Sequence, residues 1–218
     1  MKRPYDTVKR VLDVVLAATG LLLATPVLAA VALAVLVTMG RPVLFWQARP
    51  GRHGRLFHLV KFRSMTLGGE AGAPANDGAR LTPFGRWLRT TSLDELPQLW
   101  NVLRGEMSLV GPRPLLPSYL ARYTREQFRR HDVRPGITGL QQAYGRNALS
   151  WEERFALDVH YVRHRSFALD LRIVLRTVRI VLRRDGITAP GVATAREYLG
   201  PPALATAVGG RGSAEGGR

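Results

Sequence analysis

The stretch from Val14 to Met39 contains no charged residue and constrains the fold more than any other part of the chain. As one helix it would be about 39 Å long, enough to cross the hydrocarbon core of a bilayer. A cleaved signal peptide is disfavoured, because the apolar run is too long and the basic sequence after it offers no small-residue cleavage site at the expected place. The sequence therefore predicts a membrane helix within residues 1–40.

Two features favour a segment that enters the membrane and turns back. Pro26 lies near the middle after Thr25, and a proline there removes a helical hydrogen bond and bends the helix, while a threonine hydroxyl can satisfy a freed carbonyl. Cations also lie on both flanks, and cationic flanks prefer the cytoplasmic side. They are Lys2, Arg3, Lys9 and Arg10 before the segment, and Arg41, Arg49, Arg52, Arg55, Lys61 and Arg63 after it. A kinked helix that spans the bilayer is the open alternative, since such helices tolerate proline.

The charge of the chain indicates an anionic partner. Of 218 residues, 32 are Lys or Arg and 16 are Asp or Glu, which leaves a net charge of +16. Nucleic acid, an acidic membrane surface and phosphorylated substrates all fit this imbalance. The chain has no cysteine, which excludes disulfides, thiolate catalysis and Cys-based zinc sites.

The segment after the apolar run reads as a β-hairpin. Residues 43–47 and 56–62 are rich in apolar and aromatic residues and flank a turn-rich stretch. Lys61 and Arg63 alternate with apolar residues there, so we expect both on one face, toward solvent or phosphate. Residues 67–80 form a loop rich in Gly, Ala and Pro, either a mobile element over the site or a linker.

Two helices are predicted in the last third of the chain. Ser150 has the pattern of a cap for the first, with Glu152 and Glu153 in its first turn. Residues 167–184 read as a basic amphipathic helix of the kind that lies in a membrane interface, although packing on the core with a solvated arginine face is the alternative. Its arginines are Arg172, Arg176, Arg179 and Arg183, opposite Leu171, Val174, Leu175, Val178 and Leu182. From residue 190 the tail is predicted to be disordered, which gives three parts: 1–40, 41–189 and 190–218.

Asp94 and Glu95 stand side by side in a chain that is short of acid. The surrounding arginines are Arg86, Arg89, Arg104 and Arg113. Arginines around a carboxylate pair can offset its repulsion of a phosphate and bind the phosphate oxygens by forked contacts. A capping box from Ser92 to Glu95 is the alternative. Pro97 predicts that the first turn is irregular in either case.

Two Pro- and Gly-rich turns follow this stretch. Pro112 and Pro114 bracket Arg113, so that the backbone presents the guanidinium rigidly, which favours phosphate binding because little entropy is lost on contact. A proline-rich turn with a solvated arginine is the alternative. Residues 134–139 read as a second tight turn whose amides would approach a nucleotide, or else as a surface loop.

Three blocks of the sequence resemble the small monotopic phosphoglycosyl transferases of the bacterial sugar transferase family. They read SLDELPQLWNVLRGEMSLVGPRPLL, RPGITGLQQAYGRNALSWEERFALDVHYV and LVKFRSM, and matches of this length in one order are more specific than a short motif. With the apolar N-terminus the resemblance covers roughly residues 5–188. The family breaks its re-entrant helix at Ser-Pro, where this chain has Thr25-Pro26.

The resemblance implies an α+β fold, mainly helical with a small β-hairpin, in a monotopic membrane protein with a re-entrant N-terminal helix and interfacial amphipathic helices. The activity that it implies is transfer of a sugar-1-phosphate from a UDP-sugar to a polyprenyl phosphate such as undecaprenyl phosphate. UMP is released at the cytoplasmic face of the bacterial inner membrane, next to its anionic leaflet, and assembly of a surface glycan or exopolysaccharide begins.

The resemblance also assigns roles to individual residues. Asp94 matches the nucleophile that forms a phosphosugar-aspartyl intermediate, and Glu95 matches the second acid of the pair. Mg²⁺ is implied as cofactor, with Asp94 as a ligand. Cations near the phosphates are matched by Lys61, Arg89 and Arg113, and Asp158 matches a family acid grouped with that phosphate and nucleotide site.

The rival from another class is a non-catalytic basic protein that binds nucleic acid or an anionic membrane. It accounts for the charge but not for Asp94 and Glu95 among the arginines, nor for an apolar anchor, so we expect no nucleic-acid partner. A transferase without a covalent intermediate is a third reading. The sequence leaves the sugar and the oligomeric state open, a homodimer included.

Overall fold

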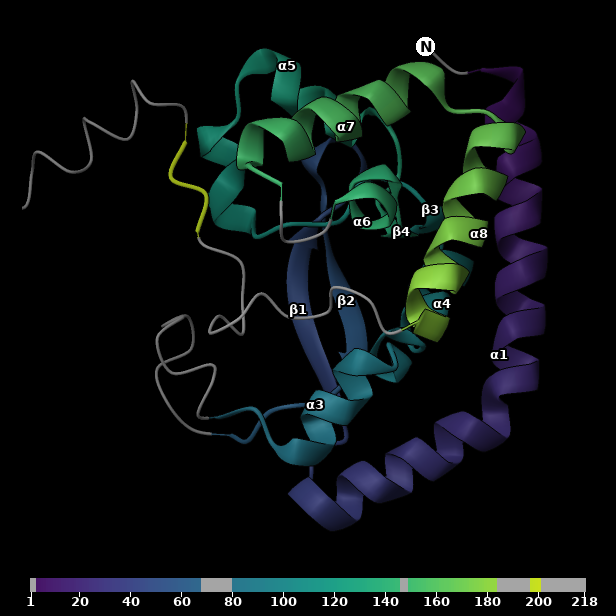
Figure 1. Ribbon diagram of the computed structural model, residues 1–218, viewed down its shortest axis with the longest axis vertical. Helices are drawn as coiled ribbons and strands as arrows, with labels where there is room; N and C mark the ends of the chain where they lie inside the picture. Colours follow the sequence, from purple (N-terminus) through teal and green to yellow (C-terminus); the bar gives the residue numbers. More distant parts are fainter. Residues whose placement is uncertain (1–2, 68–79, 146–148, 184–196, 201–218) are drawn as a thin grey trace, which may run out of the picture.

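The computed structural model describes residues 3–67, 80–145, 149–183 and 197–200 (Figure 1). Its helices and strands are α1 (Pro4–Met39), β1 (Leu44–Pro50), β2 (Leu56–Phe62), α3 (Pro83–Thr90), α4 (Gln98–Leu103), β3 (Ser108–Val110), α5 (Arg125–Phe128), β4 (Gly136–Thr138), α6 (Leu140–Tyr144), α7 (Trp151–His164) and α8 (Phe167–Arg183). Short 3-10 helices lie at Arg52–Gly54 (η1), Leu93–Glu95 (η3), Pro117–Arg122 (η4) and Arg129–Asp132 (η5). The predicted mainly helical α+β fold is confirmed.

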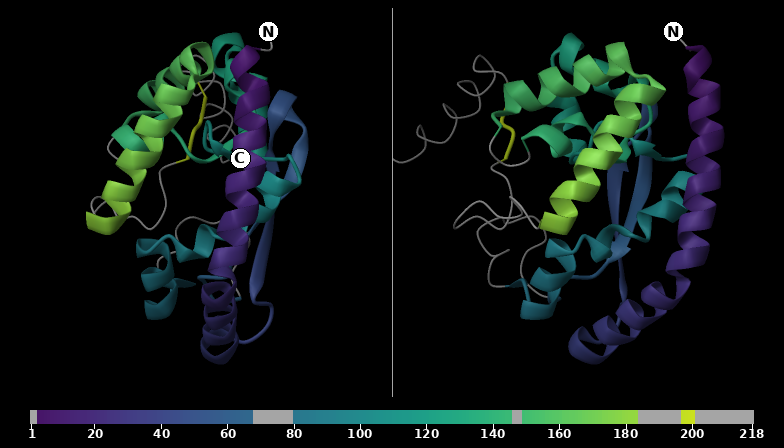
Figure 2. Two further views of the ribbon diagram at one scale, coloured as in Figure 1. Left: turned by 90° about the vertical axis from the view of Figure 1, so that its right-hand side faces the viewer. Right: turned by 45° about the vertical axis from the view of Figure 1, so that its right-hand side comes forward.

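Helix α1 is one long bent helix. Figures 1 and 2 show two arms that meet at an angle, and Pro26 inside the helix explains the bend, because its ring cannot donate to the carbonyl of Leu22. The Thr25 hydroxyl does bond a carbonyl, but that of Leu21, at 2.9 Å. The bend is therefore as predicted, whereas the threonine supports the turn beside the freed carbonyl.

Both arms of α1 pack on the same protein body. In the first arm, Ala17 is fully buried in a cluster with Val102 and Met107. In the second arm, Val31 and Val35 are buried in a cluster with residues of β2 and α3. Apolar side chains between the arms point outward, where Leu22 and Leu23 are 75% and 73% exposed. Within the described residues, α1 is the helix long and apolar enough to cross a membrane by length and composition.

The ends of α1 are fastened by charged residues from distant parts of the chain. Near the start, Asp6 pairs with Arg165 at 2.7 Å and Lys9 with Asp170 at 2.5 Å. At the end, Arg63 donates to the carbonyls of Met39 and of Gly40, the latter at 2.5 Å. These carbonyls lack partners inside the helix, which is why a guanidinium is favoured there.

This contact corrects the prediction for Arg63. The side chain does not share an outward face with Lys61, because Arg63 lies beyond the end of β2 and is 4% exposed. Side chains alternate between the two faces of a strand only within the strand. Because β2 ends at Phe62, this alternation does not predict the direction of Arg63.

The predicted hairpin is confirmed. Strands β1 and β2 pair antiparallel, from Leu44 opposite Phe62 to Pro50 opposite Leu56. Asn101 of α4 binds β2 from the side: its Oδ1 accepts from the amide of Val60 at 3.1 Å, and its Nδ2 donates to the carbonyl of His58 at 2.8 Å. This buried amide fixes α4 against the hairpin, which places the preceding turn η3 beside β2.

A second small sheet was not predicted. Strands β3 and β4 pair in parallel, with Ser108 opposite Gly136 and Val110 opposite Thr138. A Cβ on Gly136 would lie 2.1 Å from the amide nitrogen of Gly111, so the close approach of the strands requires glycine there. The amide of Gly136 donates to the carbonyl of Pro112 at 3.0 Å. The predicted nucleotide-binding turn at 134–139 is therefore wrong at Gly136, whose amide is used within the fold.

Helices α7 and α8 confirm the predicted elements. Ser150 caps α7 with a capping box to Glu153. Helix α8 turns Asp170 and Ile173 inward, while the predicted leucine and valine stripe stays outside, with Leu175 61% and Leu182 78% exposed.

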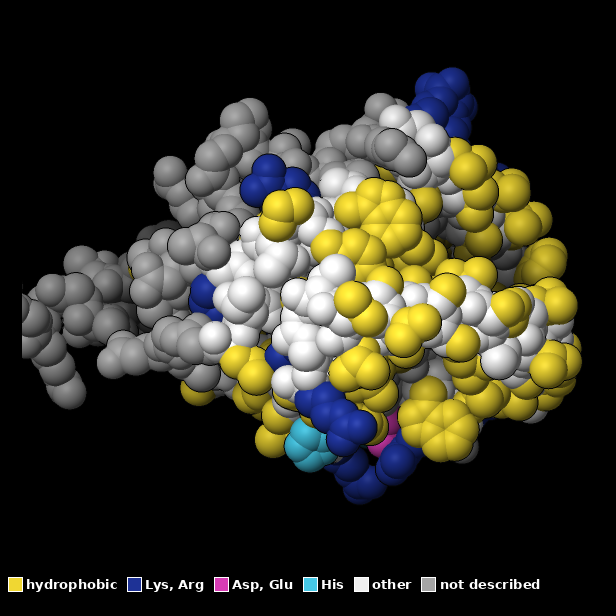
Figure 3. All heavy atoms as spheres, turned by 90° about the horizontal axis from the view of Figure 1, so that it is seen from below, with side chains coloured by type: hydrophobic (Ala, Val, Ile, Leu, Met, Phe, Trp, Pro, Cys, Tyr) yellow, Lys and Arg dark blue, Asp and Glu magenta, His cyan; other side chains and the backbone are white. Residues whose placement is uncertain are grey.

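Seen from below the view of Figure 1, hydrophobic side chains cover much of the surface, with Lys and Arg mostly toward its edges (Figure 3). Exposed apolar surface of this extent is typical of a membrane-contacting face.

Two predicted segments fall largely outside the described residues. They are the loop at 67–80, of which 68–79 are not described, and the tail from 190, of which only 197–200 are described. Within that tail the prediction of disorder is wrong at Tyr198, which is 2% exposed and packs among aromatic residues. Composition indicated disorder because the tail is rich in Gly and Ala, but one aromatic residue suffices to anchor it locally.

Candidate active site

Asp94 and Glu95 lie in η3, between α3 and α4. Ser92 takes a left-handed conformation with φ 58° and its side chain makes no capping bond, so the capping-box alternative is wrong. Helix α4 begins only at Gln98, with Pro97 as its N-cap, which confirms the irregular turn predicted from the proline. The turn buries Asp94 to 5% exposure.

Helix α3 brings Arg89 to this turn. Thr82 caps the helix by accepting from the amide of Gly85 at 2.9 Å. A Cβ on Gly85 would lie 1.8 Å from the carbonyl oxygen of Ser64, so α3 touches the chain just after β2. There the Nε of Arg89 donates to the Ser64 hydroxyl at 2.9 Å. The side chain of Arg89 thus links α3 to the segment just after β2, three residues beyond Lys61.

Three cations surround the acid pair. Burial, followed by the negative charge of Glu95, raises the pKa of Asp94 from 3.8 to about 6, and the charges of Lys61, Arg89 and Arg113 oppose that rise. Burial lowers the pKa of Lys61, and the charge of Asp94 opposes this shift. The structure thus brings together five of the predicted site residues.

Arg113 contacts the pair directly. Its Nη2 lies 2.8 Å from Oε1 of Glu95, and the charge of Glu95 raises the pKa of the guanidinium. The Arg113 side chain is 46% exposed, so it binds the acid while remaining open to a ligand. Arg104 was predicted beside the pair as well, but it pairs with Glu106 at 3.2 Å. That prediction is wrong because α4 carries Arg104 away from η3 on its C-terminal end.

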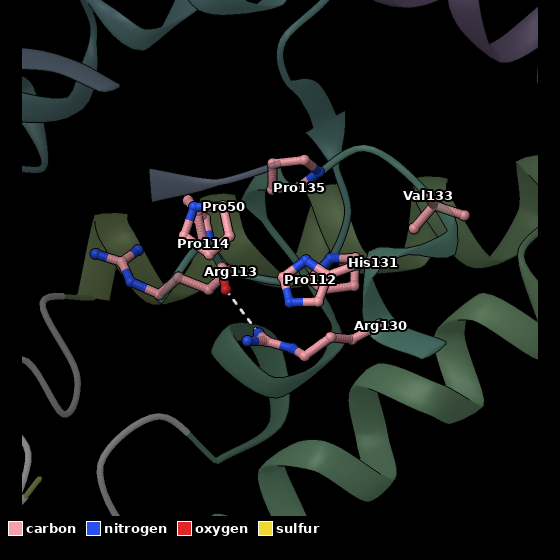
Figure 4. A pocket seen from close by; sticks show the side chains of 8 residues that line it. All are labelled: Pro50, Pro112, Arg113, Pro114, Arg130, His131, Val133 and Pro135. Atoms are coloured by element: carbon pink, nitrogen blue, oxygen red, sulfur yellow. Dashed lines mark hydrogen bonds between the residues drawn. The ribbon is translucent and has the colours of Figure 1, made fainter. Parts of the chain in front are cut away.

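Asp158 lies on α7 and is 1% exposed. Its Oδ2 accepts from Nη2 of Arg130 at 2.7 Å and from Nε of Arg130 at 3.0 Å. The same Nη2 donates to the carbonyl oxygen of Arg113 at 2.7 Å, as the dashed line in Figure 4 shows. The site is therefore coupled to Asp158 through the backbone of Arg113, and the structure shows no contact between Asp158 and the acid pair.

Figure 4 also shows how the Gly-Pro-Arg-Pro turn is held. Pro112 and Pro114 line a small pocket with His131 and Arg130, whereas the guanidinium of Arg113 extends away from it. The proline-rich turn and the displayed arginine, offered as alternatives by the sequence, are both present. Arg130 was not predicted from the sequence. It lies in a run of basic residues, and nothing in their spacing marks it out from its neighbours.

The fold and site define a class: an α+β protein with one long apolar helix and a carboxylate pair, Asp94 and Glu95, beside the cations Lys61, Arg89 and Arg113. The model of the family described as bacterial sugar transferase matches residues 4–184. The chain belongs to this family.

Curated relatives agree with this assignment. The chain is 52% identical over 196 residues to the uncharacterized sugar transferase EpsL of Bacillus subtilis, covering 88% of this chain and 96% of the relative. It is 42% identical over 191 residues to a UDP-glucose:undecaprenyl-phosphate glucose-1-phosphate transferase of Caulobacter vibrioides, covering 83% and 72%. It is 39% identical over 204 residues to an undecaprenyl-phosphate galactose phosphotransferase of Salmonella typhimurium, covering 85% of this chain but 42% of that longer protein.

Proposed function

We propose that this protein is a polyprenyl-phosphate glycosyl-1-phosphate transferase that uses Asp94 as a covalent nucleophile. The observation that carries the proposal is the buried Asp94, beside Glu95 and the cations Lys61, Arg89 and Arg113. The names of the Caulobacter and Salmonella relatives describe transfer of a sugar phosphate to undecaprenyl phosphate, which supports the same acceptor here.

In the first step, a carboxylate oxygen of Asp94 attacks the sugar-bearing phosphorus of a UDP-sugar. The bond from that phosphorus to the bridging oxygen breaks, UMP leaves with the bond electrons, and a phosphosugar-aspartyl ester remains. In the second step, a phosphate oxygen of the polyprenyl phosphate attacks the same phosphorus and frees the carboxylate. The ester divides one displacement between two bulky anions into two easier steps.

The cations make the first attack feasible. An anionic carboxylate must approach an anionic diphosphate, and positive side chains at the same place offset that repulsion. Arg113 is suited to a forked contact with phosphate oxygens, because its guanidinium is already oriented by Glu95. Glu95 in turn orients Arg113 beside Asp94.

Mg²⁺ fits this site as a cofactor shared with the substrate. The described residues contain no group of three or more His, Asp and Glu side chains that could hold a metal by themselves. Magnesium instead needs only one or two carboxylates when substrate phosphates and water complete its shell. Asp94 and Glu95 are the carboxylates that would hold it, and the ion would supply positive charge to the diphosphate.

The two arms of α1 support a monotopic arrangement at the cytoplasmic face of the inner membrane. Asp6 near the start and Val35 near the end both contact one folded body. A helix that crossed the bilayer would separate these contacts by the hydrocarbon core, about 30 Å thick. Both flanks therefore stay on the side that holds UDP-sugars, and the outward Leu22 and Leu23 enter the lipid.

The proposal is tested with purified protein in lipid nanodiscs, by UMP release from UDP-glucose and UDP-galactose in the presence of undecaprenyl phosphate. UMP as product, rather than UDP, separates this chemistry from ordinary glycosyl transfer. Without acceptor, the intact protein mass should rise by one sugar phosphate ester, and the adduct should disappear when acceptor is added. UMP release without any adduct in rapid-quench samples would favour a single displacement. The same preparation gives the oligomeric state, a homodimer included, by mass photometry.

A further inference from the structure

A short segment near the C-terminus is inserted into an aromatic socket. The socket consists of Tyr119, Tyr123, Trp151 and Phe155, and the inserted side chain is Tyr198. The centroid of the Tyr198 ring lies 4.9 Å from that of Phe155 and 6.1 Å from that of Tyr123. Edge-to-face and stacked contacts at these distances stabilise a pair of rings in addition to the area that they bury.

Polar contacts fix the same segment at both edges of the ring. The amide of Tyr198 donates to the Tyr119 hydroxyl at 3.1 Å, and the Tyr198 hydroxyl donates to Oε1 of Gln127 at 2.9 Å. Beside it, Glu197 pairs with Arg122 at 2.8 Å. The insertion is therefore specific in direction and depth.

Two rings of the socket, Tyr123 and Phe155, also contact the guanidinium of Arg130. The Arg130 guanidinium lies 5.7 Å from the ring centroid of Tyr123 and 5.5 Å from that of Phe155. The Tyr123 hydroxyl also accepts from Nη1 of Arg130 at 3.0 Å. Two of the four rings around Tyr198, those of Tyr123 and Phe155, thus also hold this guanidinium, which in turn binds the carbonyl of Arg113.

We infer that Tyr198 is a positioning residue for the donor-phosphate site, acting through Tyr123, Phe155 and Arg130 on the backbone of Arg113. The inference rests on the proposed function, in which Arg113 binds the diphosphate. Without the Tyr198 ring the socket has a cavity into which Tyr123 and Phe155 can shift. The two rings then hold Arg130 less firmly, while its bonds to Asp158 remain. A small displacement of a phosphate-binding group is costly, because a misplacement of about 1 Å can lower a rate by about 10²-fold.

The test uses full-length variants and the kinetics of UMP release. Tyr198→Ala should lower kcat/KM for the UDP-sugar by about tenfold. Tyr198→Phe keeps the ring and should stay within about threefold of the parent, which makes it the conservative rescue. Leu199→Ala is the matched control, because Leu199 is the next residue and is 58% exposed. Rates are expressed per folded protein, measured well below the unfolding temperature of each variant.

A second arm separates positioning from general stabilisation. In an Arg113→Ala background, the loss caused by Tyr198→Ala should disappear, since residues that act through one another are not additive. Full additivity of the two losses would overturn the inference, as would parental kinetics for Tyr198→Ala. Hydrogen exchange gives a readout that needs no activity: the Tyr198 amide should exchange slowly in the parent, and exchange at the free rate would show that the segment does not dock. If the parent itself releases no UMP, the proposed function fails instead.

Discussion

The Nη2 of Arg113 lies 2.8 Å from Oε1 of Glu95, so a cation from the Gly-Pro-Arg-Pro turn holds the second acid of the pair in place. The contact joins η3 to a turn that follows β3, two short segments outside the α-helices and strands. It leaves part of a half-exposed guanidinium free for a substrate. Each half of the site therefore depends on the other for its orientation.

The first prediction concerns the nucleophile. Asp94→Asn keeps the shape of the side chain and removes its charge, so UMP release should fall by about 10³-fold or more while the protein still folds. Glu95→Gln should cost less, because it weakens the orientation of Arg113 without removing the attacking oxygen. Asp132→Asn is the matched control at an exposed acid. Substantial activity of the Asp94→Asn variant, with deamidation excluded by mass, would rule out the covalent role.

The second prediction concerns Arg113. Arg113→Lys preserves the charge and loses the forked geometry, so kcat/KM for the UDP-sugar should fall by about 10- to 100-fold. Arg125→Lys, at an exposed arginine of α5, should leave the kinetics unchanged. Kinetics of the Arg113→Lys variant equal to those of the parent would reduce Arg113 to a surface charge.

The third prediction is a pH dependence. The pKa of Asp94 is raised from 3.8 to about 6, chiefly by burial, and only the deprotonated form can attack. The rate of adduct formation should therefore be constant above that pKa and fall as the pH drops through it, approaching a tenfold loss per pH unit. Rapid-quench mass measurements between pH 5 and pH 8 give this profile. A flat profile over that range would contradict the raised pKa and show that Asp94 stays deprotonated in the loaded site.

The fourth prediction concerns the buried pair Asp158 and Arg130. Asp158→Asn leaves the Arg130 charge buried and uncompensated, which should lower the free energy of unfolding by about 3–5 kcal/mol. Glu126→Gln removes the exposed pair with Arg163 and should cost less than about 1 kcal/mol. Thermal unfolding in detergent compares the two variants. Equal, small losses would show that the buried pair is not coupled as the geometry indicates.

The fifth prediction concerns topology. The chain has no cysteine, so single cysteines at Lys2 and Ser213 report without background. Both should resist a membrane-impermeant thiol reagent in intact spheroplasts and react after lysis, because cationic flanks on both sides favour the cytoplasm. Labelling of either position before lysis would mean that α1 spans. Pro26→Leu removes the cause of the bend and should expose position 2 to the reagent.

Local features of the fold could be predicted from sequence because their causes are local. The apolar run and Pro26 predict the bent α1, alternation predicts the hairpin, and Ser150 predicts the start of α7. Strands β3 and β4 could not be predicted, since each has only three residues and the pairing joins distant segments. The glycine at 136 that permits their approach looked like a turn residue.

For the site, sequence identified the acid pair, but nearness in sequence misled on its surroundings. Arg104 follows the pair closely and pairs elsewhere, whereas Lys61 and Arg113 reach it from other segments. Arg130 and Tyr198 went unnoticed because their partners lie far along the chain. A contact between distant segments leaves no pattern in the residues next to either partner, so it could not be predicted from them.

The fastening of α1 at both ends also fixes an order of events during synthesis. Helix α1 is translated before its charged partners, since the Arg165 and Asp170 that bind Asp6 and Lys9 follow 159 and 161 residues later. At about 5–20 residues per second, the ribosome needs roughly 10–30 s to make them. Through that interval the start of α1 lacks its charged partners, whereas the apolar partners of its two arms in β2, α3 and α4 have already been made. In the membrane arrangement proposed above, the lipid surface would hold the apolar run during that interval, and the outward Leu22 and Leu23 are the side chains left facing it.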